Sequence, residues 1–271
     1  MRVEACCQDL LKQILPDLDP PRRGTCFDVG VGTFAFYCQL FAQLGFATVA
    51  VEPCPTARLK TLCQRYTINL VEQCLSDRNG SQTLHLGEFA RFGNANFNSL
   101  AADWFAASGQ TRQVSTLDLS TLLTQTGTTR VTALKLDIEG WEGVVMAQLD
   151  QLPAAQLPAL VMFEYGGGGR RDQGRQGWSG KFLDSTVGCL KTLQTQGYDQ
   201  IIVIDYAAGT RAEVFSLPTL DLGPTLPFHP HSLYGNIIAL RENRYPEDYI
   251  QKITDPYQGG MVHLLVNRWF A

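Results

Sequence analysis

The chain has few charged residues and lacks several features that would place it in a common class. Charged residues make up 18% of its 271 residues, the net charge is −4, and no run of lysine and arginine stands out. Because phosphate backbones are bound by clustered positive charge, nucleic acid is not expected as a partner. The segment MRVEACCQDLLKQIL at residues 1–15 also lacks the apolar core of a signal peptide. These absences favour a cytoplasmic protein.

Cysteine is present eight times, but no two cysteines form a C-x-x-C pair, and Cys6 and Cys7 are adjacent. This spacing fits neither a zinc site nor the disulfide framework of a small secreted domain. We therefore expect reduced, mostly buried thiols, and we predict no metal site.

One uncharged stretch, Val29–Val51, is long enough to cross a membrane. Gly30, Gly32 and Gly45 interrupt it, and both of its ends have the pattern of β-strands. A strand, a glycine-rich turn, a helix and a second strand explain this stretch better than a membrane span. No membrane span is therefore predicted.

Apolar strand patterns alternate with helix patterns along the chain, which is typical of an α/β fold with a mostly parallel sheet and helices on both faces. Seven strands are predicted, at Thr25–Gly30, Ala47–Pro53, Ile68–Ser76, Val131–Gly140, Ala159–Tyr165, Gln200–Tyr206 and Ser232–Arg241. No repeat or linker divides the chain, so we expect one domain over residues 1–271. Within it, residues 1–22 are expected to form a helical extension and residues 242–271 a small helical appendage.

Helices are predicted between these strands, at Phe34–Leu44, Pro55–Tyr66, Leu117–Thr126, Trp141–Leu149 and Lys181–Gln196. From Asp77 to Gln113 the pattern loosens, and we expect only a short strand at Thr83–Glu88 and a polar loop at Phe92–Ser99. The glycine-rich segment Gly166–Gly180 does not fit regular structure. It is either a surface loop or a lid in which Trp178 stacks on an acceptor.

A glycine-rich turn follows the first predicted strand, with the sequence Asp28-Val-Gly30-Val-Gly32. Glycine lets a backbone turn tightly and approach a ligand closely. Glu52 ends the second strand, 22 residues after Gly30. An acidic residue at about this distance binds ribose hydroxyls in nucleotide-binding folds. A purely structural turn remains the other interpretation of this motif.

The position of Asp28 distinguishes between two cofactor classes. A carboxylate two residues before the first glycine is unfavourable beside a pyrophosphate, which helix amides bind. It suits a cofactor with an amino-acid moiety, whose ammonium needs an acceptor. The motif therefore favours S-adenosylmethionine over a nicotinamide dinucleotide. Ser76 and Asp77, at the end of the third strand, are candidates to contact its adenine base, although a simple turn explains them equally well.

Three charged residues lie on one predicted strand, Lys135, Asp137 and Glu139. Strand alternation places them on one face, where they can contact one another. The candidate catalytic residues are Asp137, Glu139, Lys135 and Glu164, with Asp137 or Glu139 as a base, as a ligand of the substrate hydroxyl or, less favoured, as a metal ligand. Asp137 is our first candidate base and also lies where the cofactor is expected, and Glu164 at the next strand end is the second candidate base. The alternative is a buried ion pair between Lys135 and a carboxylate that only stabilises the strand end.

The segment LKLDIEGWE, Leu134–Glu142, closely resembles the K-x-D-x-E-G-x-E signature of the FkbM family of methyltransferases. Supporting segments occur in the expected order: FDVGVG, VEP, LSDRNG, NANFNSL, TLD and FEY. The resemblance extends from about Thr25 to Tyr165. It implies a Rossmann-like class I methyltransferase fold, S-adenosylmethionine as donor and usually a hydroxyl oxygen as acceptor.

The acceptor is then a small molecule or a glycan, and the sequence identifies neither the acceptor nor the oligomeric state. The family commonly has glycine where this chain has Phe34, so a non-catalytic S-adenosylmethionine-binding module is an alternative. An NAD(P)-dependent oxidoreductase is a weaker alternative, because Asp28 disfavours it and the chain has no Tyr-x-x-x-Lys dyad.

Overall fold

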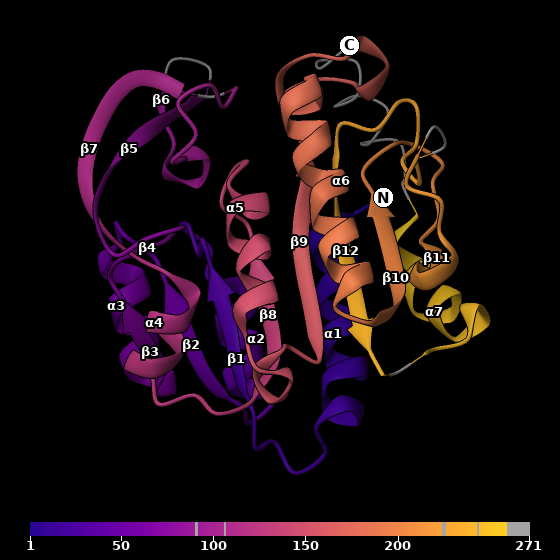
Figure 1. The fold of residues 1–271 in the computed structure, drawn as a ribbon, viewed down its shortest axis with the longest axis horizontal. Helices are drawn as coiled ribbons and strands as arrows, with labels where there is room; N and C mark the ends of the chain where they lie inside the picture. The colour runs from indigo at the N-terminus through magenta and orange to yellow at the C-terminus, as the bar shows by residue number, and fades with distance from the viewer. Residues whose placement is uncertain (90–91, 106, 224–225, 243, 259–271) are drawn as a thin grey trace. The chain divides into compact units, whose positions relative to one another are not determined.

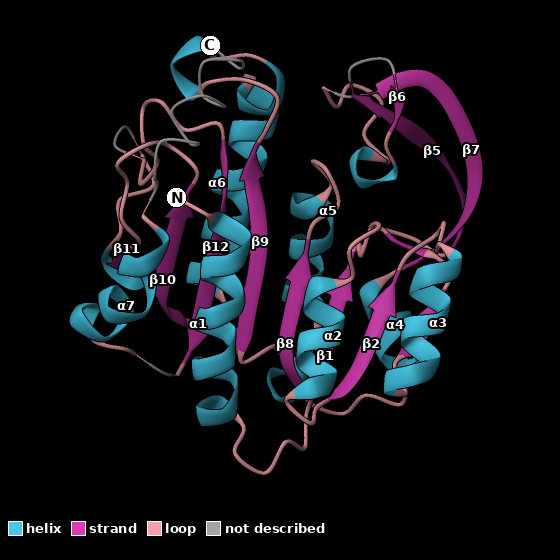
Figure 2. Cartoon of the chain, turned by 180° about the vertical axis from the view of Figure 1, so that it is seen from behind, coloured by secondary structure: helices cyan, strands magenta, loops and turns pink. Residues whose placement is uncertain are grey.

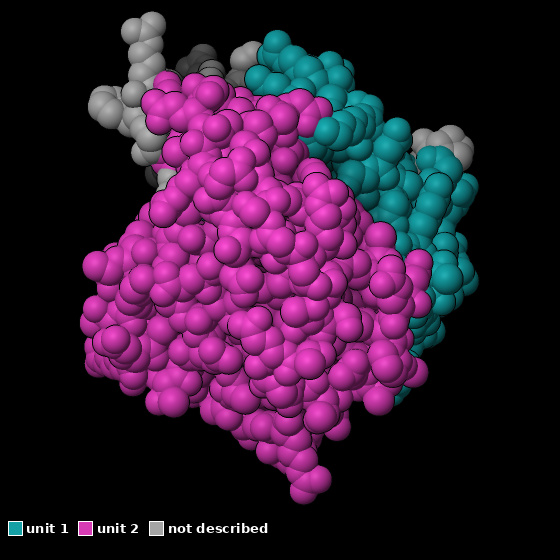
Figure 3. Space-filling view, turned by 60° about the vertical axis from the view of Figure 1, so that its left-hand side comes forward, with its two compact units in different colours: residues 1–14, 160–271 teal, residues 15–159 magenta. Residues whose placement is uncertain are grey.

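The computed structural model describes residues 1–89, 92–105, 107–223, 226–242 and 244–258. Its internal contacts divide the chain into two compact units, which are coloured in Figure 3. Leu15–Ala159 forms the central unit, and Met1–Ile14 together with Leu160–Ala271 forms the composite unit. Figures 1 and 2 show the elements of both units from opposite sides.

The central unit contains a parallel sheet in the order β8-β1-β2-β3. These strands are β1 (Thr25–Val29), β2 (Ala47–Val51), β3 (Asn69–Val71) and β8 (Val131–Leu136). Every residue of β8 is buried, as expected for a parallel strand that is covered on both faces. The carboxyl ends of the four strands share one edge, because the strands are parallel, and the residues that follow β1, β2 and β8 therefore meet at that edge.

Helices flank this sheet on both faces: α2 (Phe36–Gln43), α3 (Ala57–Tyr66), α4 (Leu119–Gln125) and α5 (Glu142–Met146). Figure 2 shows α2 and α3 in front of the sheet, whereas α4 and α5 lie in front in Figure 1. Thr56 caps α3 by accepting a hydrogen bond from the Leu59 amide, and Asp118 caps α4 in the same way. Such caps satisfy amides that have no partner within the helix.

A second sheet of the central unit has the order β4-β7-β5-β6. Its strands are β4 (Cys74–Leu75), β5 (Gly80–Phe89), β6 (Phe92–Gly93) and β7 (Ala107–Leu117). β5 and β7 form a long antiparallel pair. The segment that joins β6 to β7 includes the short 3-10 helix η1 (Ala95–Phe97) and reaches the edge of the parallel sheet, as its contacts below show.

The composite unit contains an antiparallel sheet in the order β11-β10-β12-β9. Its strands are β9 (Leu160–Gly166), β10 (Tyr198–Asp205), β11 (Glu213–Ser216) and β12 (Tyr234–Arg241), and its helices are α6 (Gly180–Thr195) and α7 (Glu247–Thr254). The first helix, α1 (Val3–Leu18), belongs to this unit up to Ile14. The remaining 3-10 helices are η2 (Ala147–Gln151), η3 (Ala154–Gln156), η4 (Arg171–Gln173), η5 (Gln176–Trp178), η6 (Leu217–Thr219) and η7 (Asp255–Tyr257).

The predicted α/β class with a mainly parallel core is confirmed, but the predicted seven-stranded sheet is wrong. In the described residues, the parallel strands β8, β1, β2 and β3 and the antiparallel strands β11, β10, β12 and β9 together make eight strands. The eighth strand, β11, has only four residues and no buried alternation, so its pattern is too weak to detect. The predicted strand Ile68–Ser76 is in fact two strands, β3 and β4, in different sheets. Whether residues 1–271 act as one domain stays a prediction.

Residue 243 and residues 259–271 of the predicted C-terminal appendage lie outside the described residues, and α7 lies within the part that is described. The predicted helical extension corresponds to α1. All eight cysteines lie among the described residues as thiols outside disulfides, and seven of them are buried. Among the helices that the structure describes, none is both long and apolar enough to cross a membrane.

Candidate functional site

The glycine-rich turn that follows β1 adopts backbone angles that only glycine accepts easily. Gly30 has φ of +72° and Gly32 has φ of +59°. A Cβ atom on Gly30 would lie 1.8 Å from the carbonyl oxygen of Asp137, and one on Gly32 would lie 2.5 Å from Oδ1 of Asn96. Both glycines are therefore required by the contacts that the turn makes with residues 96 and 137.

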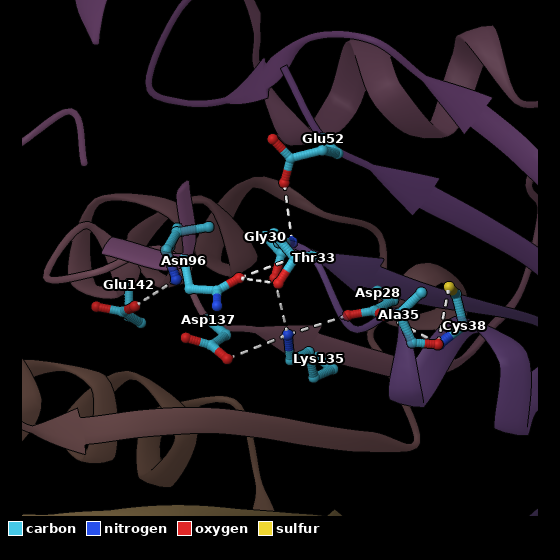
Figure 4. Close-up of polar contacts among 12 residues, drawn as sticks. Asp28, Gly30, Thr33, Ala35, Cys38, Glu52, Asn96, Lys135, Asp137 and Glu142 are labelled. Atoms are coloured by element: carbon cyan, nitrogen blue, oxygen red, sulfur yellow. Dashed lines mark hydrogen bonds and ion pairs between the residues drawn. The ribbon is translucent and has the colours of Figure 1, made fainter. Parts of the chain in front are cut away.

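Asp28 and Lys135 form a buried ion pair beneath this turn (Figure 4). Nζ of Lys135 lies 3.0 Å from Oδ1 of Asp28 and donates to the Gly30 carbonyl oxygen, also at 3.0 Å. The other carboxylate oxygen of Asp28 accepts a hydrogen bond from the amide of Cys38 in α2. Asp28 thus already has protein partners at both oxygens, and it connects β8, the glycine turn and α2.

Glu52 reaches the same turn from the end of β2. Its carboxylate accepts hydrogen bonds from the amides of Gly32 and Cys54, both at 3.0 Å. The side chain is only 7% exposed, and burial raises the pKa of this carboxyl above its ordinary value. A direct hydrogen bond therefore joins the acid at the end of β2 to the glycine turn, and the binding of ribose by Glu52 stays a prediction.

Asn96 of η1 is a site residue that the sequence prediction treated only as part of a loop. Its Oδ1 accepts hydrogen bonds from the Thr33 amide at 2.8 Å and from the Thr33 hydroxyl at 3.0 Å. The segment between β6 and β7 thereby touches the glycine turn, although 63 residues separate Asn96 from Thr33 along the chain. Only the recurrence of asparagine in the NANFNS segment gave a signal for such contacts.

Asp137 lies directly after β8, at the same edge of the sheet. Its amide donates to the Val29 carbonyl at 3.1 Å, and its Oδ2 lies 3.4 Å from Nζ of Lys135. Its side chain is 33% exposed, whereas those of Asp28 and Lys135 are 1% and 4% exposed. Asp137 is therefore the carboxylate of this group that a ligand can reach most easily.

The alternation expected for Lys135, Asp137 and Glu139 is only half correct. β8 ends at Leu136, so Glu139 lies beyond the strand and not on its face. Its backbone is left-handed, with φ of +56°, an uncommon conformation for a residue other than glycine. The Glu139 carboxylate accepts from Trp104, whereas the ion pairs of Lys135 are with Asp28 and Asp137.

The Glu139 carboxyl is buried and held by the segment that precedes β7. Trp104 donates from Nε1 to its Oε2 at 2.6 Å, and the Ser99 hydroxyl donates to its main-chain oxygen, also at 2.6 Å. Burial raises the pKa of Glu139 well above its usual value, and the neighbouring carboxylates of Asp137 and Glu142 raise it further. Its neutral form is favoured, so Glu139 is a less accessible base than Asp137.

Glu142, the first residue of α5, holds the same turn from the other side. Its Oε1 accepts a hydrogen bond from the Ile138 amide at 2.8 Å. Burial raises the pKa of this carboxyl to about 7, even though that hydrogen bond favours the charged form. The contacts of Glu142 with the Ile138 amide and of Ser99 with the Glu139 carbonyl oxygen together fix the main chain that directly follows Asp137.

Ser76 and Asp77 lie after β4, at the end of a short strand of the second sheet. The Ser76 hydroxyl donates to Oδ1 of Asp77 and accepts from the side chains of Gln82 and Trp141. Asp77 is exposed and partly desolvated, but hydrogen bonds from Gln82 and Ser76 lower its pKa below the usual value. Ser76 is thus occupied by protein contacts, and Asp77 presents the more accessible side chain.

Glu164 lies on β9 and belongs to the composite unit, so its expected role beside Asp137 stays a prediction. The suggestion that Trp178 stacks on an acceptor is wrong. Trp178 is 1% exposed, packs against Tyr165 and Phe228, and donates from Nε1 to the Leu233 carbonyl oxygen at 3.1 Å. The glycines around it explain why the sequence looked like a flexible loop: a Cβ on Gly166 would lie 2.6 Å from the Trp178 ring.

Phe34, the residue that departs from the family pattern, is exposed beside the glycine turn. Its side chain is 54% exposed and stacks on that of Phe36, with ring centroids 5.3 Å apart. Ala35 between them adopts a left-handed conformation with φ of +56°. The large ring therefore points to solvent and does not fill the space next to Gly30 and Gly32.

Comparison with known families agrees with this geometry. Residues 24–199 match the family profile described as the methyltransferase FkbM domain, a longer range than the sequence motifs alone suggested. No curated protein matches the chain significantly.

Proposed function

Because the chain belongs to the FkbM methyltransferase family, we propose that it transfers a methyl group from S-adenosylmethionine to a hydroxyl oxygen of a small molecule or glycan. The observation that carries this proposal is the hydrogen bond between Glu52 and Gly32 at 3.0 Å. It joins a glycine-rich turn after β1 to a buried acid after β2. This combination is typical of folds that bind an adenosine through its ribose hydroxyls.

The residues present fit such a cofactor. Glu52 would hold the ribose hydroxyls, and Gly30 and Gly32 would allow the main chain to approach the ligand closely. Asp77, whose carboxylate accepts a hydrogen bond from the Ser76 hydroxyl, would contact the adenine edge. Asp28 was expected to bind the ammonium of the methionine moiety. Its contacts with Lys135 and Cys38 support a different role, in which it holds the turn in place from beneath.

When bound, S-adenosylmethionine supplies an electrophilic methyl group on a positively charged sulfur. Transfer of that group is fast when the acceptor oxygen is aligned close to the methyl carbon. We propose that Asp137 accepts the hydroxyl proton of the acceptor, because it is the most exposed of the grouped carboxylates. Lys135 would orient Oδ2 of Asp137, and Glu139 would fix the turn that carries it. Glu164 is kept as the second candidate base.

A ligand-binding experiment tests the cofactor assignment directly. S-adenosylmethionine and S-adenosylhomocysteine should raise the melting temperature in proportion to the logarithm of ligand concentration, whereas NAD and NADP should leave it unchanged. Stabilisation by NAD or NADP, without any by S-adenosylhomocysteine, would contradict the proposal. Transfer of a labelled methyl group to hydroxyl compounds then tests the acceptor class.

The alternative of a non-catalytic S-adenosylmethionine-binding module is motivated by Phe34 and its exposed ring. Such a module would bind S-adenosylhomocysteine but would transfer no methyl group to any acceptor. Replacing Phe34 by the glycine common in the family should then leave methyl transfer absent, whereas an active enzyme would show it with or without the substitution.

A further inference from the structure

The side-chain amide of Asn96 has an orientation that its partners define. The Thr33 amide can only donate, so the atom of Asn96 that faces it must be the carbonyl oxygen Oδ1. The Thr33 hydroxyl donates to the same oxygen. The amide nitrogen Nδ2 must therefore point away from Thr33. Figure 4 shows it directed to the side of the turn on which the Asp137 carboxylate lies.

Nδ2 of Asn96 makes no hydrogen bond to any residue that the structure describes, whereas Oδ1 makes two. The side chain is partly buried, and its two N–H groups can donate to a ligand beside the turn. Oδ1 is so close to the turn that a Cβ on Gly32 would lie 2.5 Å from it. The two hydrogen bonds of Oδ1 thus place an N–H donor beside the part of the site assigned to the cofactor.

We infer that Nδ2 of Asn96 donates a hydrogen bond to the α-carboxylate of the methionine moiety of the cofactor. This inference rests on the proposed function. A carboxylate ligand needs donors, and the acidic side chains nearest the turn, Asp28, Glu52 and Asp137, offer none while ionised.

The competing explanation is that Asn96 serves only to hold the turn through Thr33. Replacement by aspartate separates the two roles. In Asn96→Asp, a carboxylate oxygen still accepts both hydrogen bonds from Thr33, but the donor is replaced by a second acceptor. Asn96→Ala removes both functions. Asn98→Asp is the matched control, because Oδ1 of Asn98 accepts from the Gly87 amide at 2.9 Å in the same segment.

Two ligands that differ in the amino-acid moiety report on the proposed contact. S-adenosylhomocysteine carries the α-carboxylate, and 5′-methylthioadenosine lacks the whole amino-acid group. We expect Asn96→Asp to weaken S-adenosylhomocysteine binding roughly 10- to 100-fold, the effect of losing a hydrogen bond to a charged group. Binding of 5′-methylthioadenosine should be unchanged, and Asn98→Asp should change neither affinity. Isothermal titration calorimetry at fixed pH and salt measures both.

Each result decides between the explanations. Equal weakening of both ligands in Asn96→Asp would overturn the inference and leave Asn96 as a structural residue, and so would no weakening of either. If the unmodified protein binds neither ligand, the proposed function itself fails. Because 5′-methylthioadenosine tests the adenosine site separately, failure of the inference and failure of the proposed function are distinguishable.

Discussion

At the scale of single residues, five carboxylates around the glycine turn and the end of β8 have different surroundings. Asp28 is paired with Lys135, Glu52 accepts two amides, and Glu142 accepts one, so these three are held by the protein itself. Glu139 is buried against Trp104. Only Asp137 combines a charged neighbour with appreciable exposure. Substitutions of these residues should therefore have different effects, although the residue types are nearly the same.

We expect Asp137→Asn to keep the fold and the affinity for S-adenosylhomocysteine, while turnover falls by a factor of about 10²–10⁴. The fold is kept because Lys135 retains its nearer partner, Asp28, at 3.0 Å. Denaturant unfolding, calorimetry and a methyl-transfer assay measure the three quantities. A large loss of stability in Asp137→Asn, mostly recovered in the double variant with Lys135→Met, would instead identify Asp137 as half of a structural ion pair.

Asp28→Asn should behave in the opposite way. It leaves the buried Lys135 ammonium without its nearest carboxylate, and breaking a buried pair on one side typically costs about 3–5 kcal/mol. We expect this loss in the free energy of unfolding, with partial recovery when Lys135→Met is added. A stability equal to that of the unmodified protein would show that Asp137 alone is enough to compensate Lys135.

Glu52→Gln tests the ribose assignment with little change in shape. If Glu52 holds the ribose hydroxyls, S-adenosylhomocysteine binding should weaken by roughly 1.5–3 kcal/mol, the scale of hydrogen bonds to a charged group. 5′-Methylthioadenosine should weaken equally, because it carries the same ribose. Unchanged affinity by calorimetry, with the protein folded, would reduce Glu52 to a residue that only holds Gly32 and Cys54.

Glu142 should make the stability of the protein depend on pH. Its pKa in the folded protein is about 7, above the value of 4.5 expected in the unfolded chain. Folding favours the neutral form of the Glu142 carboxyl. The contribution of this carboxyl to the free energy of unfolding is therefore fully present below about pH 4.5 and is lost as pH rises through 7. In Glu142→Gln the free energy of unfolding should no longer fall by this amount, roughly 3 kcal/mol between pH 4.5 and 8. Parallel pH profiles of the two proteins in denaturant unfolding would contradict the assignment.

At the scale of elements, the turn after β1 should tolerate no side chain at Gly30. In Gly30→Ala the new Cβ would lie 1.8 Å from a main-chain oxygen of residue 137, which cannot move without shifting β8. We expect a loss of about 3–5 kcal/mol in unfolding free energy, together with loss of S-adenosylhomocysteine binding. Gly109→Ala is the control, because its φ is +81° but no atom lies within 4 Å, so only roughly 1 kcal/mol of strain is expected. Similar losses in both variants would show that backbone angle alone matters.

The elements that could be predicted are those with a strong local pattern. β1, β2, α2 and α3 carry continuous apolar runs or helical periodicity bounded by glycine and proline, and the structure confirms them. β7 was missed because most of its residues are exposed and polar, so no alternation marks it. The end of β8 was placed at Gly140 because the charged residues alternate there; the left-handed turn at Glu139 depends on Trp104 and Ser99, which are distant in the sequence.

The sequence predicted which strand-end residues lie at the candidate site, but it did not predict the contacts that a loop makes there. Asp28 lies near the end of β1, and Glu52 and Asp137 directly follow β2 and β8, so the parallel order of these strands brings all three to one edge. The contact of Asn96 with Thr33 spans 63 residues and involves a 3-10 helix, for which local sequence carries little information. Trp178 was misplaced for a related reason, because its partners Phe228 and Leu233 lie about 50 residues further on.

At the scale of the whole molecule, the order of the units along the chain has a consequence for synthesis on the ribosome. The central unit is continuous from Leu15 to Ala159, whereas α1 belongs mainly to a unit completed by residues after 160. The amide of Arg2 donates to the Tyr257 carbonyl oxygen, and Cys6, Leu10 and Ile14 are fully buried. At about 5–20 residues per second, α1 emerges roughly seven to thirty seconds before β9 begins to appear. During this interval the partners of α1 in the composite unit are still missing, and its apolar face stays uncovered while the central unit is completed.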